Sequence, residues 1–134
     1  MPIQAEALTA KSLMPGYTVD DLDHSIAFYE AIGFKVAQRW DDNGTPIGAM
    51  LSAGSVMLGL NQDDWKKGRG RQKGLGTRLN IETTQNIDEI ANRVKAAGYK
   101  IDVDPFDTPW KTRQFELTDP SGFKITVSSE WPDA

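Results

Sequence analysis

The sequence predicts an α+β fold in which two tandem βαβββ units form a curved eight-stranded mixed sheet with helices on its outer face. The same order of elements occurs twice along the chain, and in each half a glycine ends the helix and another lies in the last hairpin. The spacing from Gly33 to Gly98 is nearly that from Gly54 to Gly122. Such regular spacing is typical of a duplicated supersecondary unit.

The first half is predicted to contain a strand, a helix and a meander of three strands. Residues 13–19 are rich in β-branched and aromatic side chains and end at Asp20-Asp21, which can cap a helix. Apolar residues then recur at helical spacing over residues 22–32. The Asn43-Gly44 pair predicts a tight hairpin turn. The three strands of the meander are expected at residues 34–40, 47–53 and 56–60.

Residues 61–76 have little hydrophobic patterning and include the basic run WKKGRGRQKG at residues 65–74. Composition of this kind is typical of a mobile, solvated connection. We therefore expect a linker between the halves. A second interpretation, in which the basic run closes as a flap over an anionic ligand, stays open.

The second half repeats the first, beginning with a strand at residues 77–83. Asn86 can cap the next helix, and Glu89 can complete a capping box. The buried stripe of this helix is predicted to be Ile87, Ile90, Val94 and Ala97. Three further strands are expected at residues 99–103, 113–118 and 123–129.

Composition limits the function. The chain has 134 residues, 39% of them hydrophobic and 25% charged, as expected for one globular domain over residues 1–134 with repeat halves at about 12–62 and 76–130. It has no cysteine, which excludes disulfides and thiolate chemistry. A net charge of −4 and a pI near 4.9 argue against nucleic acid as a partner.

No apolar run approaches the length of a membrane span, so no membrane partner is expected. Residues 1–11 lack the basic start and apolar run of a secretion signal. The expected location is therefore the cytoplasm.

Two segments carry a family resemblance. The string YTVDDLDHSIAFYEAIGF resembles the first strand and helix of the vicinal oxygen chelate superfamily, which includes glyoxalases, bleomycin resistance proteins and extradiol dioxygenases. The string FELTDPSGFKITVSSE is similar to its closing hairpin. The resemblance covers residues 13–130. It implies the fold, but that fold hosts both enzymes and drug-sequestering proteins, so function must be argued from the site.

The resemblance also implies where a metal would be held. Members that do metal chemistry place one His, Glu or Gln on each of four strands, and these positions correspond to Met14, Leu58, Arg78 and Thr126, or Thr77 in place of Arg78 if the register slips. None of these side chains suits a divalent cation. The chain is therefore identified with the metal-free, bleomycin-resistance-like branch, and no cofactor is expected. The single histidine, His24, is expected on a solvated helix surface.

Strand alternation points Arg78, Asn80 and Glu82 into the concavity, while Leu79 and Ile81 pack under the helices. Thr126, Lys124 and Ser128 are expected on the same side of the last strand, and further lining is expected from Met14, Gly16, Thr18, Val56, Leu58 and Leu60. An amphipathic pocket of this kind is typical of small-molecule sites. Alternatively, Arg78 and Glu82 satisfy each other as an ion pair.

The segment PWKTRQFELTDPSG is similar to a pattern in metal-free drug-binding relatives, which implies a ligand contact for Trp110, Arg113 and Phe115. Trp110 could stack on a planar or cationic ligand or pack at the sheet edge. Asp119 and Pro120 are expected to form a turn and not a site.

Three functions remain open. The first is a metal-independent binding protein that holds an aromatic or cationic antibiotic or metabolite in a pocket shared by a homodimer. The second is a glyoxalase-like lyase or isomerase with Glu82 or Glu116 as base and Arg78 stabilising an oxyanion. The third is a structural or regulatory module without a ligand.

Overall fold

The computed structural model describes residues 6–130 and confirms two consecutive βαβββ modules. The first module contains β1 (Gly16–Val19), α1 (Leu22–Ile32), β2 (Lys35–Asp42), β3 (Thr45–Ala53) and β4 (Val56–Gln62). The second contains β5 (Arg78–Glu82), α2 (Ile87–Ala96), β6 (Val103–Asp107), β7 (Thr112–Thr118) and β8 (Lys124–Glu130). Neither helix within residues 6–130 is long and apolar enough to cross a membrane.

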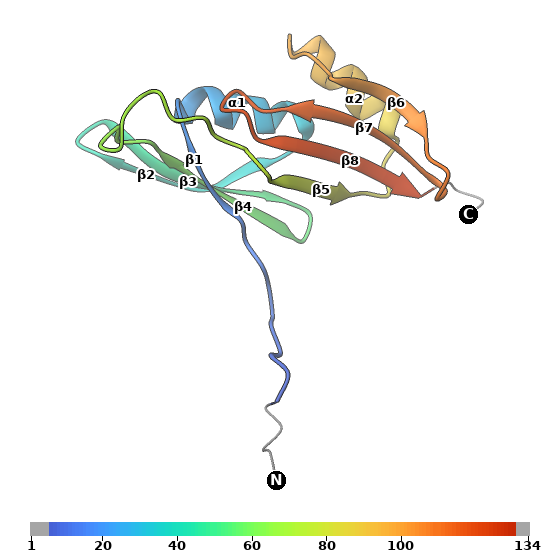
Figure 1. Cartoon of the computed structure of the whole chain (residues 1–134), viewed down its shortest axis with the longest axis horizontal. Helices are drawn as coiled ribbons and strands as arrows, with labels where there is room; N and C mark the ends of the chain where they lie inside the picture. Colours follow the sequence, from blue (N-terminus) through green and yellow to red (C-terminus); the bar gives the residue numbers. More distant parts are fainter. Residues whose placement is uncertain (1–5, 131–134) are drawn as a thin grey trace.

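The eight strands divide into two mixed sheets of four, in the orders β1-β4-β3-β2 and β5-β8-β7-β6. In each sheet the first strand of the module runs parallel to the last, and the other pairs are antiparallel. Both helices lie on the same side of the two sheets (Figure 1). We call this side the helix side, and the opposite, uncovered side of each sheet its open face.

Helix α1 begins and ends where the sequence predicts. The side chain of Asp21 accepts a hydrogen bond from the backbone N–H of His24 at 3.1 Å, and Gly33 ends the helix with φ at 130°. The last turn of α1 has no basic residue of its own. Arg93 of α2 instead donates to the carbonyl oxygens of Ala31 and Ile32. This contact adds positive charge where the helix dipole favours it and ties the two modules together.

Helix α2 is capped by the side chain of Asn86, which accepts a hydrogen bond from the backbone N–H of Glu89 at 3.0 Å. The prediction of a buried stripe is confirmed for Ile87, Ile90 and Val94. It is wrong for Ala97, which is exposed because it is the C-cap residue and lies beyond the last full turn. Ala91 takes the buried place within the helix.

The strand predicted at residues 99–103 is also wrong, because β6 begins only at Val103. Tyr99 and Ile101 pack against the core from irregular chain. Strand β6 includes Pro105, which has no N–H to donate. A proline is tolerated there because β6 is at the edge of its sheet.

The two modules pack through aromatic and polar contacts. The rings of Tyr17 and Phe123 stack with their centroids 3.9 Å apart. The hydroxyl of Tyr29 in α1 donates to the carboxylate of Asp119, which precedes β8, at 2.7 Å. Asp119 also accepts from the backbone N–H groups of Ser121 and Phe123, both at 2.9 Å. Asp119 therefore forms a turn, as predicted, and also joins the modules.

The linker between the modules is anchored, so the prediction of a solvated connection is wrong for part of it. Asp63 is buried and accepts hydrogen bonds from Arg71 at 2.6 Å and from the backbone N–H of Trp65 at 2.8 Å. The ammonium group of Lys73 lies 2.9 Å from the same carboxylate and also contacts Asp20. The Lys73 side chain is only 8% exposed. We call Asp63, Arg71 and Lys73 the linker clasp.

Because of the linker clasp, we expect the stability of the folded protein to depend on pH in acidic solution. The hydrogen bond from Lys73, followed by that from Trp65, lowers the pKa of Asp63 from its ordinary 3.8 to about 2. Because the folded-state pKa is depressed, the stability that Asp63 contributes is present above pH 3.8 and is lost as the pH falls towards 2.

Urea unfolding should therefore give a higher free energy of unfolding for the native protein than for Asp63→Asn at pH 6. The difference between these two free energies should shrink steadily below pH 3.8. A difference that stays constant down to pH 2.5 would show that the carboxylate charge contributes nothing. Asp64→Asn is the matched control, because Asp64 is exposed and contacts the exposed Lys66, whose ammonium group lies 3.9 Å away and whose backbone N–H donates to the Asp64 carboxylate at 2.9 Å.

Candidate functional site

The open face of the second module is polar. On β5 and β8 every second side chain turns to the helix side and packs in or against the core. These side chains are Leu79, Ile81, Ile125 and Val127. Strand alternation and pairing therefore place the following side chains on the open face: Arg78, Asn80, Glu82, Gln114, Glu116, Thr118, Lys124, Thr126 and Ser128. The prediction for Arg78, Asn80, Glu82 and Thr126 agrees with this placement.

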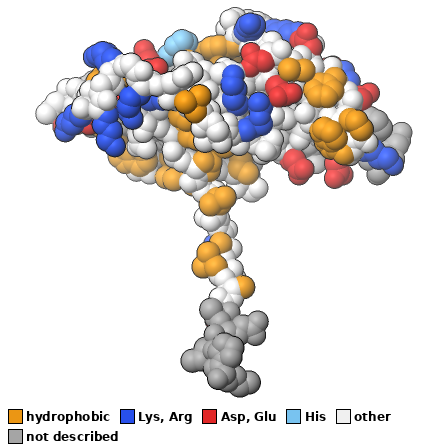
Figure 2. All heavy atoms as spheres, in the orientation of Figure 1, with side chains coloured by type: hydrophobic (Ala, Val, Ile, Leu, Met, Phe, Trp, Pro, Cys, Tyr) orange, Lys and Arg blue, Asp and Glu red, His pale blue; other side chains and the backbone are white. Residues whose placement is uncertain are grey.

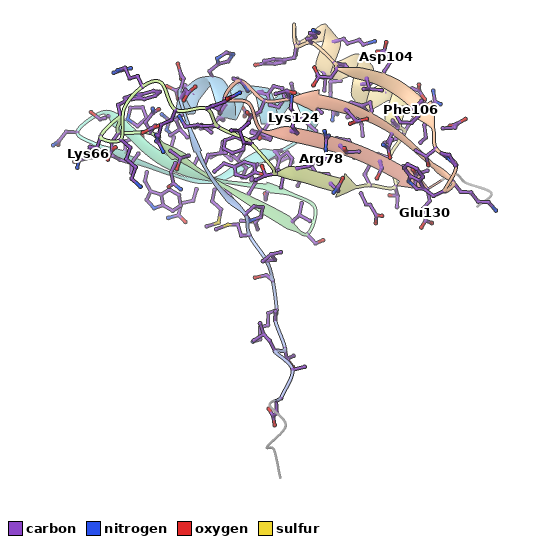
Figure 3. The ribbon with its side chains drawn as sticks, viewed as in Figure 1. Lys66, Arg78, Asp104, Phe106, Lys124 and Glu130 are labelled. Atoms are coloured by element: carbon purple, nitrogen blue, oxygen red, sulfur yellow. The ribbon has the colours of Figure 1, made fainter. Side chains whose placement is uncertain are left out.

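Arg78 is the first residue of the edge strand β5 (Figure 3), and its guanidinium group contacts two neighbouring strands on this face. Its Nη1 donates to Thr126 Oγ1 at 3.0 Å and lies 3.1 Å from Glu116 Oε1. The expected ion pair between Arg78 and Glu82 is wrong, because four residues along one strand span about 13 Å. Glu116 is closer because β7 pairs with β8 and sets Glu116 opposite Thr126. Arg78 is 39% exposed and remains accessible to a ligand.

A second polar chain lies at the end of the same face. Lys124 Nζ donates to Thr118 Oγ1 at 3.0 Å, and the Thr118 hydroxyl donates to Asp102 at 2.5 Å. Both cations of this face therefore have polar neighbours. Strand pairing and these contacts hold both side chains in place.

The open face of the first module is apolar. The Met14 side chain covers Gly59, since a Cβ built on Gly59 would lie 3.6 Å from Met14 Cε. Met50 is opposite Gly59 in the neighbouring strand, and Trp40 is opposite Gly48. Met14 and Trp40 are 45% and 41% exposed. Methionine and tryptophan side chains beside glycines form an adaptable apolar surface.

The sequence prediction misplaced Leu58 and missed the neighbours that replace it. Leu58 is 2% exposed and pairs with Leu51 in the core on the helix side, as Leu60 pairs with Ala49. Because successive side chains alternate, Met57 and Gly59 are on the open face instead. Counting the alternation outward from Leu51 would have found Met57.

The residues at the four implied ligand positions do not fit a divalent metal. Met14, Arg78 and Thr126 offer a thioether, a guanidinium and a hydroxyl, and the β4 position offers Met57 or Gly59. Across residues 6–130, no three His, Cys, Asp or Glu side chains gather in a way that could hold a metal ion. His24 is exposed on α1, as expected, with its ring centroid 6.5 Å from that of Tyr99.

Three residues predicted from drug-binding relatives are not on either open face. Phe115 is fully buried on the helix side. Arg113 also turns to the helix side and donates to Asp88 at 2.7 and 2.8 Å and to Asp107 at 3.0 Å. The Asp88 contact, followed by Asp107, raises the pKa of Arg113. Trp110 is 67% exposed in the β6–β7 turn.

Two cavities lie beside Glu82, at the opposite end of β5 from Arg78. One, of about 720 Å³, is at the start of α2 and includes Asp88 and Arg113 in its wall. The other, of about 480 Å³, is between the modules and includes Phe34 and Val56. Glu82 lines both, whereas Arg78 and Met14 line neither.

A family model described as Glyoxalase/Bleomycin resistance protein/Dioxygenase superfamily matches residues 11–127. A comparison with curated proteins found no match.

Solved structures share the fold at low sequence identity. A hypothetical protein from S. aureus aligns with a TM-score of 0.70 and 19% identity over 90% of this chain and 95% of its own. TioX from Micromonospora sp. ML1 aligns with a TM-score of 0.69 and 21% identity, over 92% and 99%. Lactoylglutathione lyase from Agrobacterium tumefaciens aligns with a TM-score of 0.65 and 19% identity, over 90% and 95%. Identities this low establish the fold alone.

Proposed function

Since the chain belongs to the Glyoxalase/Bleomycin resistance protein/Dioxygenase superfamily, we propose that it is a metal-independent protein that binds a small organic molecule between two copies of the chain. One observation carries the proposal. The positions that would hold a metal present Met14, Arg78 and Thr126, with Arg78 hydrogen-bonded to Thr126 in place of a cation. The site therefore offers apolar contact and hydrogen-bond donors, and no metal ligands.

The character of the two open faces supports a shared site. Small-molecule sites are concave, mostly apolar and equipped with a few convergent polar groups. The first-module face supplies Met14, Trp40 and Met50, and the second-module face supplies Arg78 and Glu82. The first-module face of one copy opposed to the second-module face of another would combine both properties in each of two equivalent sites.

The ligand class follows from the same side chains. Trp40 and the methionines favour an aromatic group, by stacking and by sulfur–aromatic contact. Within residues 6–130 the Glu82 carboxylate has no ion-pair partner, so it is available to a cationic group of the ligand. We therefore propose an aromatic compound carrying an amine, such as an antibiotic or a metabolite.

A thermal shift series tests the proposal. Among a panel of aromatic amines and their neutral analogues, a true ligand at 100 times its dissociation constant should add about 2.7 kcal/mol of stability. Glu82→Gln should weaken binding of the amine and leave that of the neutral analogue unchanged. Asp104→Asn is the control, because Asp104 pairs with Lys95 of α2 on the helix side at 2.7 Å.

Either of two results would overturn the proposal. The first is stoichiometric zinc, nickel, iron or manganese in protein purified without chelators and assayed for metal. The second is the absence of any melting shift across the panel.

A second candidate, catalysis, is favoured by the contact between Arg78 and Glu116 at 3.1 Å. Glu116 could remove a proton from a bound substrate while Arg78 stabilises the oxyanion that forms. Glu116→Gln would then abolish turnover and leave ligand affinity within a few-fold. If the variant binds and the native protein still converts no bound ligand, the binding function alone remains.

A further inference from the structure

Two cations lie side by side on the open face of the second module. Arg78 of β5 is paired in register with Lys124 of β8, and strand alternation points both side chains to the open face. We propose that these two side chains together bind an anionic group, a carboxylate or a phosphate, and that the ligand is therefore an amphoteric molecule whose amine lies at Glu82. The inference rests on the proposed function, because it concerns the ligand of the same site.

The charges around this pair do not balance. Like charges directly opposite each other on neighbouring strands destabilise a sheet. Among residues 6–130, Glu116 is the only acidic residue that contacts either cation, at 3.1 Å from Arg78 Nη1. Lys124 Nζ donates instead to the neutral hydroxyl of Thr118 at 3.0 Å, and this hydroxyl separates it from the carboxylate of Asp102. Two positive charges in contact with one carboxylate leave room for a further anion.

The free donors of the two cations are of the kind that binds oxyanions. Nη1 of Arg78 makes the contacts with Thr126 and Glu116. The N–H groups on Nε and Nη2 donate to no other group within residues 6–130. Such a free edge of a guanidinium group matches two oxygens of a carboxylate or a phosphate. The exposed ammonium group of Lys124 also retains donors beyond the one that it directs at Thr118.

The opposite end of the same face is acidic. Glu82 follows Arg78 by four residues along β5, a separation of about 13 Å. Glu130 ends β8, at the far end of that strand from Lys124 (Figure 3), and alternation from Ser128 places it on the same face. Neither glutamate forms an ion pair with another residue of the described range 6–130. Figure 2 shows basic side chains over the middle of the molecule and acidic side chains near its lower right edge.

Uncharged side chains lie between the two charged ends. On β5 and β8 these are Asn80, Thr126 and Ser128, which are short and leave space above the sheet. Phe106 of β6 borders this strip, because it is opposite Gln114, which is in turn opposite Ser128. A half-buried phenylalanine at this place can stack on an aromatic ring. The face therefore suits a ligand in which a ring separates an anionic group from an amine.

A matched series of small probes tests the inference. The probes are para-(aminomethyl)benzoate, its methyl ester and para-(aminomethyl)phenyl phosphate, which share the ring and the amine. The ester lacks the negative charge. Isothermal titration calorimetry gives the dissociation constant of each probe. We expect the constant of the ester to exceed that of the better anionic probe by about tenfold or more, because an ionised acceptor strengthens hydrogen bonds from cations. The anionic probe that binds more tightly identifies the group as carboxylate or phosphate.

Two variants assign this preference to the two cations. Lys124→Gln removes one positive charge. The double variant Arg78→Gln with Glu116→Gln removes the guanidinium and its carboxylate together, so the net charge of the chain stays at −4. Each variant should lower the ratio of the ester constant to the acid constant about threefold or more. Lys100→Gln is the matched control, because Lys100 is exposed between α2 and β6 and its loss changes the net charge as Lys124→Gln does. It should leave the ratio unchanged.

A measurement on the native protein needs no variant. Inorganic phosphate is titrated into isotope-labelled protein, and the side-chain Nε–H resonances of the arginines are followed by nuclear magnetic resonance. The resonance of Arg78 should move along a saturating curve. That of Arg39 is the internal reference, because its Nε–H already donates to Asp41 at 3.2 Å, and it should stay in place. Equal movement of both resonances would mean that phosphate acts only through ionic strength, which would overturn the inference.

The remaining outcomes separate this inference from the proposed function. Equal affinity of the native protein for the acids and the ester would overturn the anion site and leave the amine site intact. A preference for the acids that Lys100→Gln reduces as much as Lys124→Gln does would reflect net charge alone and would also overturn the inference. Absence of binding by every probe, inorganic phosphate included, would overturn it as well, whereas the proposed function is decided by the melting shifts of the aromatic amine panel.

Discussion

Gly74→Ala is expected to lower the free energy of unfolding by about 3–5 kcal/mol, from combined overpacking and backbone strain. Gly74 has φ at 80° and faces the turn before β8, where an added Cβ would lie 2.1 Å from the carbonyl oxygen of Gly122. The obstructing atoms are backbone and cannot rotate away. The linker would have to leave the second module, and the change is measurable by urea or thermal unfolding.

Two other linker glycines separate the causes. Gly70→Ala meets no atom within 4 Å and has no positive φ, so it should be nearly neutral. Gly76→Ala also meets no atom but has φ at 72°, so it should cost only the strain, about 1–2 kcal/mol. If Gly74→Ala lowers the free energy of unfolding by no more than Gly76→Ala does, the linker does not approach Gly122 closely in solution.

Asp119→Ala is expected to destabilise the protein by about 3–5 kcal/mol. The change removes the acceptor for the buried Tyr29 hydroxyl and for the backbone N–H groups of Ser121 and Phe123. The Tyr29 hydroxyl and the Phe123 N–H are buried and then lack this partner, which is more costly than the loss of an exposed hydrogen bond. Unfolding in urea gives the difference.

Tyr29→Phe is the partial counterpart, because it leaves Asp119 with its two backbone donors. Tyr29→Phe should lower the free energy of unfolding by about 1.5–3 kcal/mol. Burial, followed by the Asp119 carboxylate, raises the pKa of Tyr29 well above its ordinary 10.0. The stability that Tyr29 contributes is therefore present below pH 10 and is lost as the pH rises above that value.

The difference in the free energy of unfolding between the native protein and Tyr29→Phe should accordingly be constant from pH 6 to 9. This difference should become smaller only in more alkaline solution. If Tyr29→Phe and Asp119→Ala destabilise the protein equally, the hydrogen bonds from the backbone N–H groups of Ser121 and Phe123 to Asp119 contribute nothing to stability, which would contradict this prediction.

Local signals predicted the elements because local physics decides them. The Asn43-Gly44 turn has φ at 50° and 80°, the left-handed conformation that this pair tolerates. The Asp21 and Asn86 caps form hydrogen bonds with residues three positions along the chain. The prediction of residues 99–103 as a strand failed because a sheet edge forms only where a neighbouring strand offers partners, and β7 pairs with β6 from Val103 onward.

The candidate site was predicted in part. Alternation along β5 gave the direction of Arg78 because neighbouring Leu79 and Ile81 pack against the core. For Leu58 the neighbouring positions are both apolar, so hydrophobicity did not reveal which side faces the helices. The pairing of β3 with β4 sets Leu58 opposite the buried Leu51, and this pairing decides that Leu58 faces the helices. Phe115 and Arg113 were assigned by similarity to relatives, and packing under α2 placed them on the helix side.

The sequence by itself determined the duplicated βαβββ units and their caps and turns, because each depends on residue type and short spacing. Only the tertiary structure decided which distant charges meet. Arg78 contacts Glu116, and Lys73 contacts Asp63 and Asp20, through strand pairing and chain crossing that no local pattern encodes. The strength of such contacts depends on burial and separation in space, and both arise only when the modules pack.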